Sequence, residues 1–242
     1  MTPLLIENDL IRPQPRKDAL RTIFLLYEGL NTEVSLINPL IANTTLFKNV
    51  PVRFRPLRKT GNDIGRTSPL AMIDIALKFI RDNCGPKGCF KCERDKVLIV
   101  FDLDVAKNDQ TEIDKIKQRK TSDMILCFTN PAIELFLLLA RKGSYRDLIA
   151  PHEKEIIEND YFPSENGKKE RFVLHLFKEN FGIDPKDKEA DFRFVLENID
   201  TVFQQENMYL NHHLSEAANK LTSNIAYVLK KIKNDKIDEI QY

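Results

Sequence analysis

Acidic side chains follow two apolar runs of this sequence, each at the point where a strand is expected to end. Glu28 follows TIFLLY (22–27), and Asp102 and Asp104 close the stretch KVLIVFDLD (96–104). In open parallel sheets, ligands bind beyond the carboxyl ends of the strands. If the second strand stays extended, its two aspartates share one side, because side chains on a strand repeat every two residues. We therefore expect three carboxylates to converge on one small volume.

Carboxylates packed so closely repel one another and raise one another's pKa unless a cation neutralises them. Mg²⁺ (or Mn²⁺) prefers oxygen ligands and is usually held by a few carboxylates together with substrate phosphates. The chemistry implied is phosphoryl transfer or phosphodiester hydrolysis. The alternative is that these acids are solvated strand ends or helix caps. That alternative is better for any single Asp, whereas the three acids together favour a metal site.

The residues from about 20 to 142 must form the elements that position these acids. Short apolar runs alternate there with helical patterns, which predicts a parallel sheet with crossover helices. Uninterrupted apolar runs predict buried strands at 22–27, 96–101 and 123–128. The stretch 50–57 alternates apolar and basic residues between prolines, which predicts an edge strand.

Helices are expected between these strands. The predicted ranges are 34–41, 68–83, 109–120 and 130–143. Pro39 is expected to end or kink the first of them. Ser68 is the expected N-cap of the second, and Asn130 followed by Pro131 has the pattern of an N-cap and first helical residue in the last.

The remainder of the chain divides into an N-terminal extension (1–19) and a C-terminal region (143–242). The C-terminal region has no convincing strand and is predicted to be helical. One helix is expected to end on Gly182, and apolar residues recur at helical spacing over 187–203 and 214–232. The last stripe is more typical of packing against the domain, or against a twin subunit in a homo-oligomer, than of a functional surface.

Three segments taken together resemble the RloB-like family. They are LLYEGLNTE, FDLD after a buried strand, and FTNPAIELFLLLA. That family is similar to the wider Toprim group, which includes the catalytic domains of topoisomerases, primases and overcoming-lysogenization-defect nucleases. The resemblance covers about 20–142. It implies an α/β fold with a Toprim-like, mostly parallel sheet flanked by helices, followed here by the helical C-terminal region.

The resemblance also implies roles for individual residues. Glu28 would be a metal ligand or general acid/base, and Asp102 and Asp104 would hold Mg²⁺ used to make or break phosphodiester bonds. Glu33 matches a second acid of the nuclease branch and would join the metal site. Asn130 and Glu134 match a further motif that would support it. The sequence departs from the family pattern at three positions of that last segment, Ala132, Phe136 and Ala140.

A basic stretch lies between residues 50 and 66. Its cations are Arg53, Arg55, Arg58, Lys59 and Arg66. The net charge of the chain is +1, so any surface that attracts nucleic acid must be local. In a parallel sheet the loop that ends this stretch leaves from the same edge as the acids, where cations suit a phosphate backbone. Protection of an edge strand by charge explains the stretch equally well.

The four cysteines and four histidines give weaker signals. Cys84, Cys89 and Cys92 have the spacing of a plant-type iron–sulfur site, but Cys127 lies in an apolar run typical of a buried structural cysteine. A zinc or iron–sulfur site is therefore the less favoured interpretation. In the cytoplasm, the expected location, all four are expected to stay reduced. The pair His212–His213 suits metal binding or proton transfer, although most such residues lie on surfaces or at helix ends.

The function predicted is that of a Mg²⁺-dependent phosphodiesterase or nuclease, and the resemblance to the RloB-like family implies a role in a bacterial anti-phage or restriction-linked system. DNA, tRNA and other RNA all fit as substrates. A partner ATPase is implied by the resemblance alone. Two alternatives stay open: a haloacid-dehalogenase-type phosphatase, whose nucleophile motif also fits FDLD, and a non-catalytic interaction module that partners an ATPase. No apolar run approaches the roughly 20 residues of a membrane span, so no membrane contact is expected.

Overall fold

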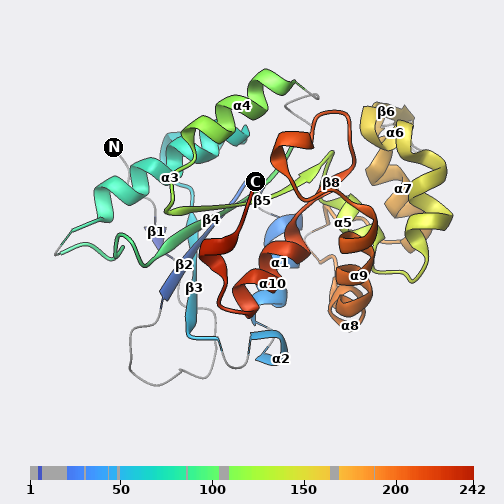
Figure 1. Ribbon diagram of the computed structural model, residues 1–242. Coiled ribbons are helices and arrows are strands. Elements are labelled where there is room, and N and C mark those ends of the chain that lie inside the picture. The colour runs from blue at the N-terminus through green and yellow to red at the C-terminus, as the bar shows by residue number, and fades with distance from the viewer. Residues whose placement is uncertain are drawn as a thin grey trace.

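A mostly parallel sheet forms the centre of the computed structural model (Figure 1). The structure describes residues 5–6, 21–29, 31–42, 44–47, 50–85, 87–103, 109–163, 169–187 and 189–242. Within these residues the sheet has six strands in the order β1-β3-β2-β4-β5-β8. The four central strands are mutually parallel, and the two short outer strands are antiparallel to their neighbours. This mixed α/β architecture is consistent with the expected Toprim-like fold.

The central strands are the predicted apolar runs. Their bounds are β2 Arg21–Tyr27, β3 Val52–Arg58, β4 Lys96–Asp102 and β5 Met124–Asn130, and the outer strands are β1 Leu5–Ile6 and β8 Thr222–Ser223. The expectation of an edge strand at 50–57 is wrong in part, because β1 pairs with the carboxyl end of β3 and β2 pairs along its other side.

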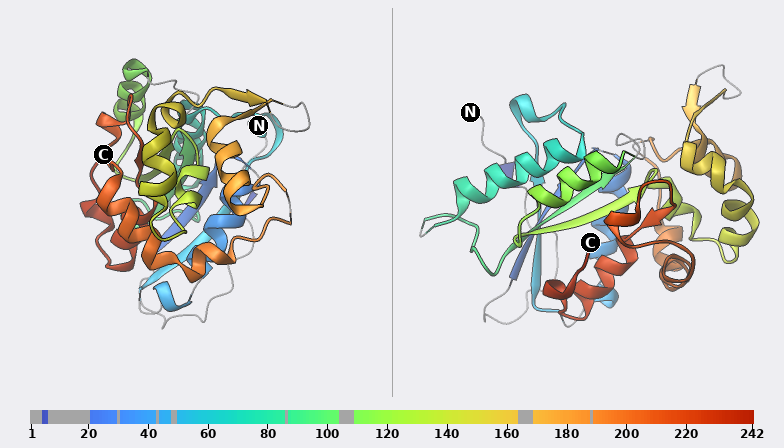
Figure 2. Two further views of the ribbon diagram at one scale, coloured as in Figure 1. Left: turned by 90° about the vertical axis from the view of Figure 1, so that its right-hand side faces the viewer. Right: turned by 45° about the horizontal axis from the view of Figure 1, so that its top comes forward.

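Helices cover both faces of the sheet (Figures 1 and 2). On one face lie α3 Pro69–Asn83 and α4 Gln110–Arg119, side by side. On the other lie α1 Thr32–Ala42, α2 Thr44–Phe47 and α10 Ile225–Lys233. The strands serve both faces by alternation: Ile23 and Leu25 pack towards α1, whereas Phe24 and Leu26 pack towards α3. This double burial explains why these strands are apolar without interruption.

Further helices, α5 and then those of the C-terminal region, follow the carboxyl end of β5. They are α5 Glu134–Leu138, α6 Glu153–Glu158, α7 Phe172–Phe181, α8 Arg193–Glu197 and α9 Ile199–Tyr209. Gly182 caps α7 in the left-handed conformation, as predicted. Short π and 3-10 turns occur at Tyr145–Ile149, Ala150–His152, Leu214–Glu216 and Ile237–Glu239, and one more lies in the first half at Gly61–Asp63.

The prediction that the C-terminal region contains no strand is wrong. A hairpin of β6 Tyr161–Pro163 and β7 Lys169–Arg171 stands beside α7, and β8 joins the main sheet. Beyond β8, the Asn224 side chain continues the pairing along β5. It accepts the Phe128 N–H at 2.8 Å and donates to the Leu126 carbonyl at 2.9 Å. The free edge of β5 is thereby covered by residues far away in sequence.

Several helix predictions also differ from the structure. The stripe over 214–232 is interrupted by β8 and is α-helical only from Ile225, and the stripe over 187–203 forms α8 and the start of α9. Of the two effects expected of Pro39, it does not end α1, which continues to Ala42. Asn130 is not a helix cap, because it is the last residue of β5 and its bond to Pro131 is cis. The helix that follows begins only at Glu134. By contrast, Ser68 caps α3 as predicted, since its Oγ accepts the Ala71 N–H at 3.3 Å.

None of the helices in the described ranges is long and apolar enough to cross a membrane.

Candidate active site

The carboxyl ends of β2 and β4 meet where the strand order of the sheet reverses. From β2 the chain crosses to β3 on one side and then to β4 on the other, and such switch points form crevices that bind ligands. Glu28 directly follows β2, and its N–H donates to the Val100 carbonyl of β4 at 2.9 Å. Its carboxylate Oε2 accepts the Asp102 N–H at 2.8 Å. The structure therefore brings Glu28 and Asp102 together.

Asp104, the third acid of the opening pattern, lies outside the described residues. The preceding chain is extended as expected: β4 includes Asp102, and the Leu103 N–H donates to the Thr129 carbonyl of β5 at 2.8 Å. Asp102 stands opposite Thr129 in the register. The Thr129 hydroxyl donates to Asp102 Oδ1 at 2.5 Å, which fixes the orientation of that carboxylate.

Glu33 reaches the same place from the first turn of α1. Its carboxylate folds back to accept the Gly29 N–H at 3.2 Å, and its residue is 8% exposed. A Cβ built on Gly29 would stand 2.5 Å from Glu33 Oε2, so the absence of a side chain there allows the close approach. Burial raises the pKa of Glu33, while its contacts with backbone N–H groups and the charge of Lys59 oppose the rise.

The electrostatic environment of Asp102 is strongly perturbed. Burial is the main cause that raises its pKa well above the ordinary value, followed by the charges of Glu33, Glu28 and Glu134. The hydrogen bond from Thr129 opposes this rise but does not overcome it. We call Glu28, Glu33, Asp102 and Glu134 the acid cluster. Its excess of negative charge is the main feature of the site.

Lys59 supplies a cation beneath the acid cluster. It is 5% exposed, and its Nζ donates to the carbonyl oxygens of Glu28 at 2.5 Å and Arg66 at 3.2 Å. Burial lowers its pKa, and the charges of Glu28, Glu33 and Asp63 act in the opposite direction. The ammonium is thus directed into the protein. Lys59 Nζ has these internal partners, and the expected contact of Lys59 with a phosphate stays a prediction.

The other basic residues of the predicted stretch do not form one surface with Lys59. Arg58, at the carboxyl end of β3, is exposed on the side of the acid cluster. Arg53 and Arg55 are half-buried along β3, towards its amino end. Arg66 is held by ion pairs with Asp63 at 3.2 Å and with Asp74 at 3.5 Å. Of the five, Arg58 is best placed to meet a ligand at the site.

The two predicted supporting residues take different positions. Glu134 lies in the first turn of α5, is 6% exposed, and adds its charge to the field at Asp102. The Asn130 amide instead donates to the carbonyls of Ala217 at 2.7 Å and Lys220 at 2.9 Å. Asn130 therefore ties the end of β5 to the segment before β8.

The residues present fit a hard divalent cation by their chemistry. Glu28, Glu33 and Asp102 are carboxylates, and the pKa of Asp102 is raised first by burial and then by the charges of neighbouring carboxylates, a repulsion that a cation would relieve. Among the described residues, however, no three His, Cys, Asp or Glu side chains are already arranged around a common metal position, and this includes the His212–His213 pair. The predicted ligand Asp104 lies outside that description.

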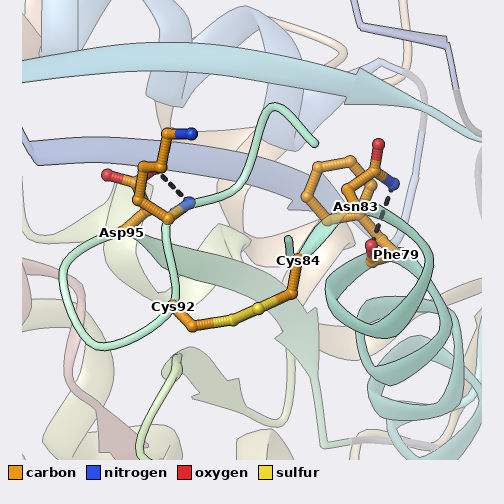
Figure 3. The surroundings of a disulfide bond; sticks show 6 residues. Phe79, Asn83, Cys84, Cys92 and Asp95 are labelled. Atoms are coloured by element: carbon orange, nitrogen blue, oxygen red, sulfur yellow. Dashed lines mark hydrogen bonds between the residues drawn. A yellow bond between two sulfur atoms is a disulfide. The ribbon is translucent and has the colours of Figure 1, made fainter. Parts of the chain in front are cut away.

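The cysteine loop differs from expectation (Figure 3). Cys84, which caps α3, and Cys92 form a disulfide with Cα atoms 6.0 Å apart, a normal separation. The expectation that all four cysteines are reduced is therefore wrong. Cys89 and Cys127 are free thiols, and Cys127 is buried as predicted.

Local hydrogen bonds hold both sides of this loop, as Figure 3 shows. The Asn83 amide donates to the Phe79 carbonyl at 2.9 Å, and Asp95 accepts the Lys91 N–H at 2.9 Å. Asp95 also accepts the Thr22 N–H of β2 at 2.9 Å. The loop thus contacts the amino end of β2, opposite the acid cluster.

The sequence analysis did not predict two contributors to the site. Thr129 is part of the segment FTNPAIELFLLLA without a role of its own there, yet its hydroxyl orients Asp102. The strand register gives a signal for Thr129. Two buried strands pair in parallel, and a hydroxyl residue near the end of one stands opposite an acid at the end of the other. Gly29 was not singled out, although its position directly after Glu28 indicates a close approach of backbone to a neighbouring group.

No protein-family model, curated protein or solved structure matches this chain.

Proposed function

We propose that this protein is a divalent-metal-dependent phosphodiesterase that acts on nucleic acid. One observation carries the proposal: at the switch point of a parallel sheet, where Glu28 Oε2 accepts the Asp102 N–H, burial and then the charges of Glu33, Glu28 and Glu134 raise the pKa of Asp102 well above its ordinary value. Carboxylates crowded in this way are typical of functional sites that hold a cation.

Each residue of the site has a part in this proposal. Glu28, Glu33 and Asp102 would hold Mg²⁺ or Mn²⁺, together with Asp104 of the same motif. The bound cation supplies charge neutralisation and polarisation of a phosphate oxygen. Thr129 holds Asp102 in one orientation through its hydroxyl, and Lys59 fixes the backbone at Glu28. The charge of Arg58 at the mouth of the site favours a phosphate-bearing substrate.

The test compares the wild-type protein with Asp102→Asn and with Asp114→Asn, which removes an exposed carboxylate on α4. Thermal unfolding is followed with and without Mg²⁺ or Mn²⁺, and cleavage is assayed on DNA, tRNA and other RNA. The wild type and Asp114→Asn should gain stability with metal by mass action and cleave one of these substrates. Asp102→Asn should do neither.

Other outcomes decide between the alternatives. A phosphate trapped covalently on Asp102 would favour a haloacid-dehalogenase-type phosphatase. Absence of both metal-linked stabilisation and cleavage, even with a partner ATPase present, would reject the phosphodiesterase and favour an interaction module. The partner ATPase and the setting in a bacterial anti-phage or restriction-linked system stay predictions, tested by isolating the protein with its native partners.

A further inference from the structure

A second feature adjoins the acid cluster: a cavity of about 260 Å³ between α1 and the carboxyl ends of β2 and β3. We call it the β2–β3 cavity. Its lining includes Tyr27, Val34, Asn38, Pro56, Leu57 and Arg58. Its volume is slightly below the range of pockets that hold drug-sized ligands, roughly 300–1,000 Å³. The cavity is therefore large enough for a small planar group such as one nucleobase.

The cavity is continuous with the acid cluster. Gly29 and Lys59 belong to its lining, and the same two residues contact Glu33 and Glu28. A ligand in the cavity would therefore lie within one or two residues of the carboxylates. The exposed Arg58 stands at its mouth, where a guanidinium suits a phosphate that leads from the cavity to the acids.

The walls and polar groups of the cavity match an unpaired base. Val34 and Leu57 provide apolar surface, and Tyr27 adds an aromatic ring. Val34 and Asn38, four residues apart, lie on one face of α1. The Tyr27 hydroxyl donates to Asn38 Oδ1 at 2.5 Å, which leaves the two Asn38 N–H groups as donors held in a fixed direction. Proteins hold an unstacked base in an apolar pocket that presents a few hydrogen-bonding groups in fixed positions.

We propose that the β2–β3 cavity binds one unpaired base of a nucleic-acid substrate next to the phosphate held at the acid cluster. This inference rests on the proposed function and deepens it, because it assigns the substrate a single-stranded or unstacked nucleotide. The cavity takes the base, Arg58 takes the connecting phosphate, and the Asn38 amide donates to a carbonyl oxygen or ring nitrogen of the base.

The experiment measures binding of a short single-stranded oligonucleotide, made as RNA and as DNA, with Ca²⁺ in place of Mg²⁺ to neutralise the acids, and the oligonucleotide is verified to be intact after each measurement. The duplex of the same sequence and single strands with one abasic position serve as probes. The wild type should bind the single strand about tenfold more tightly than the duplex. An abasic residue at one position should remove most of that difference.

Two variants test the assignment of residues. Asn38→Leu removes the amide, whereas Tyr27→Phe breaks the same hydrogen bond but leaves the amide in the cavity. Asn38→Leu should lose about tenfold in affinity, and Tyr27→Phe should lose much less. Val34→Phe fills the cavity and should abolish the preference for the single strand. Asn207→Leu is the matched control, because Asn207 lines a separate cavity of about 310 Å³ between α9 and α10. It should bind as the wild type does.

The outcomes separate this proposal from the proposed function. If Asn38→Leu and Val34→Phe both fold and bind as the wild type does, the cavity is not a base site, whatever the cleavage assay shows. If the wild type does not bind the single strand or prefers the duplex, the proposal also falls. If binding responds to the variants but no metal or substrate gives cleavage, the base site stands and the phosphodiesterase does not.

Discussion

Glu206 and Asp102 are carboxylates with little contact to solvent in two different regions of this protein, and their surroundings are opposite. Glu206 of α9 is 0% exposed and lies at the amino end of α10. Its oxygens accept the Ser223 hydroxyl at 2.6 Å and the Tyr227 N–H at 3.0 Å. Burial raises its pKa to about 7, although the hydrogen bonds that it accepts from Ser223, Ala226 and Tyr227 oppose the rise. Hydrogen-bond donors within the protein satisfy this carboxylate, and it caps the amino end of α10.

Asp102 has the reverse surroundings. One hydroxyl donates to it, and three further carboxylates act together with burial to raise its pKa. A carboxylate surrounded by donors stabilises the contact between two elements, whereas one surrounded by other carboxylates costs stability until a cation arrives. The difference teaches that burial of an acid is not in itself a sign of function. The sign of the neighbouring charges separates a structural acid from a candidate ligand.

The strongest test of this difference between Glu206 and Asp102 is to neutralise each acid in turn. Asp102→Asn should lower metal-dependent cleavage by about 10²–10³-fold, as expected when several kcal/mol of charge stabilisation are lost. Without metal its melting temperature should stay the same or rise, because a repulsion is relieved. Glu206→Gln should leave the cleavage rate per folded molecule unchanged. Equal losses of activity in both variants, measured on folded protein, would show that the two acids do not differ in kind.

A pH series sharpens the same contrast. The folded pKa of Glu206 is about 7 and its ordinary value is 4.5, so its contribution to stability is fully present below pH 4.5 and is lost as the pH rises through 7. At about 1.4 kcal/mol per unit, the free energy of unfolding should fall by about 3 kcal/mol over this window from Glu206 alone. Denaturant unfolding at several pH values measures it.

The control for this series is Glu206→Gln, which keeps the shape of the side chain. Its unfolding free energy should fall less over the same window. The acids of the acid cluster, Glu33 and Asp102, have raised pKa values and contribute a decline of the same sign, which remains in this variant. A slope that does not differ between the two proteins would show that Glu206 is not buried as described.

Lys59 is the cation that offsets part of the charge of the acid cluster, and its removal should affect stability and metal binding in opposite directions. Lys59→Met keeps the length and apolar stem but leaves two buried carbonyl contacts unmade, which should cost about 2 kcal/mol of unfolding free energy without metal. The site becomes more negative, so Mn²⁺ should bind more tightly. Metal titration followed by thermal unfolding checks both effects.

The matched control for Lys59 is Arg58→Met, which removes the neighbouring exposed cation. It should leave the stability nearly unchanged and weaken binding of the single-stranded oligonucleotide. If Lys59→Met is as stable as the wild type and binds nucleic acid less well, then Lys59 contacts phosphate, as the sequence first suggested, and its internal position is wrong.

The central part of the fold was predictable because it depends on burial on both faces. Strands with that environment are apolar without interruption, so β2, β4 and β5 were found within one or two residues. The meeting of Glu28 and Asp102 followed from parallel strands whose carboxyl ends share one edge. Both inferences use only local composition and the rules of parallel sheets.

What failed depends on contacts between distant residues. β8 has two polar residues, Thr222 and Ser223, and becomes a strand only because the edge of β5 is open beside it. The Asn130–Pro131 pair has the local pattern of a helix start, but Asn130 is held by carbonyls of residues 217 and 220. Lys59 lies in a run of charged residues that is typical of solvent exposure, and only the fold shows that Lys59 itself is buried.

The smallest effect, and the most local, concerns Gly29. Its Cβ would stand 2.5 Å from Glu33 Oε2, so Gly29→Ala should push the Glu33 carboxylate away from the Gly29 N–H and cost about 1 kcal/mol of stability. Gly65→Ala is the matched control, because a Cβ there meets nothing within 4 Å and should be neutral or slightly stabilising. Because Glu33 moves but keeps its charge, Gly29→Ala should weaken Mn²⁺ binding severalfold without abolishing it. Unchanged metal affinity in Gly29→Ala, with the expected loss of stability, would remove Glu33 from the set of ligands and leave the site to Glu28, Asp102 and the predicted ligand Asp104.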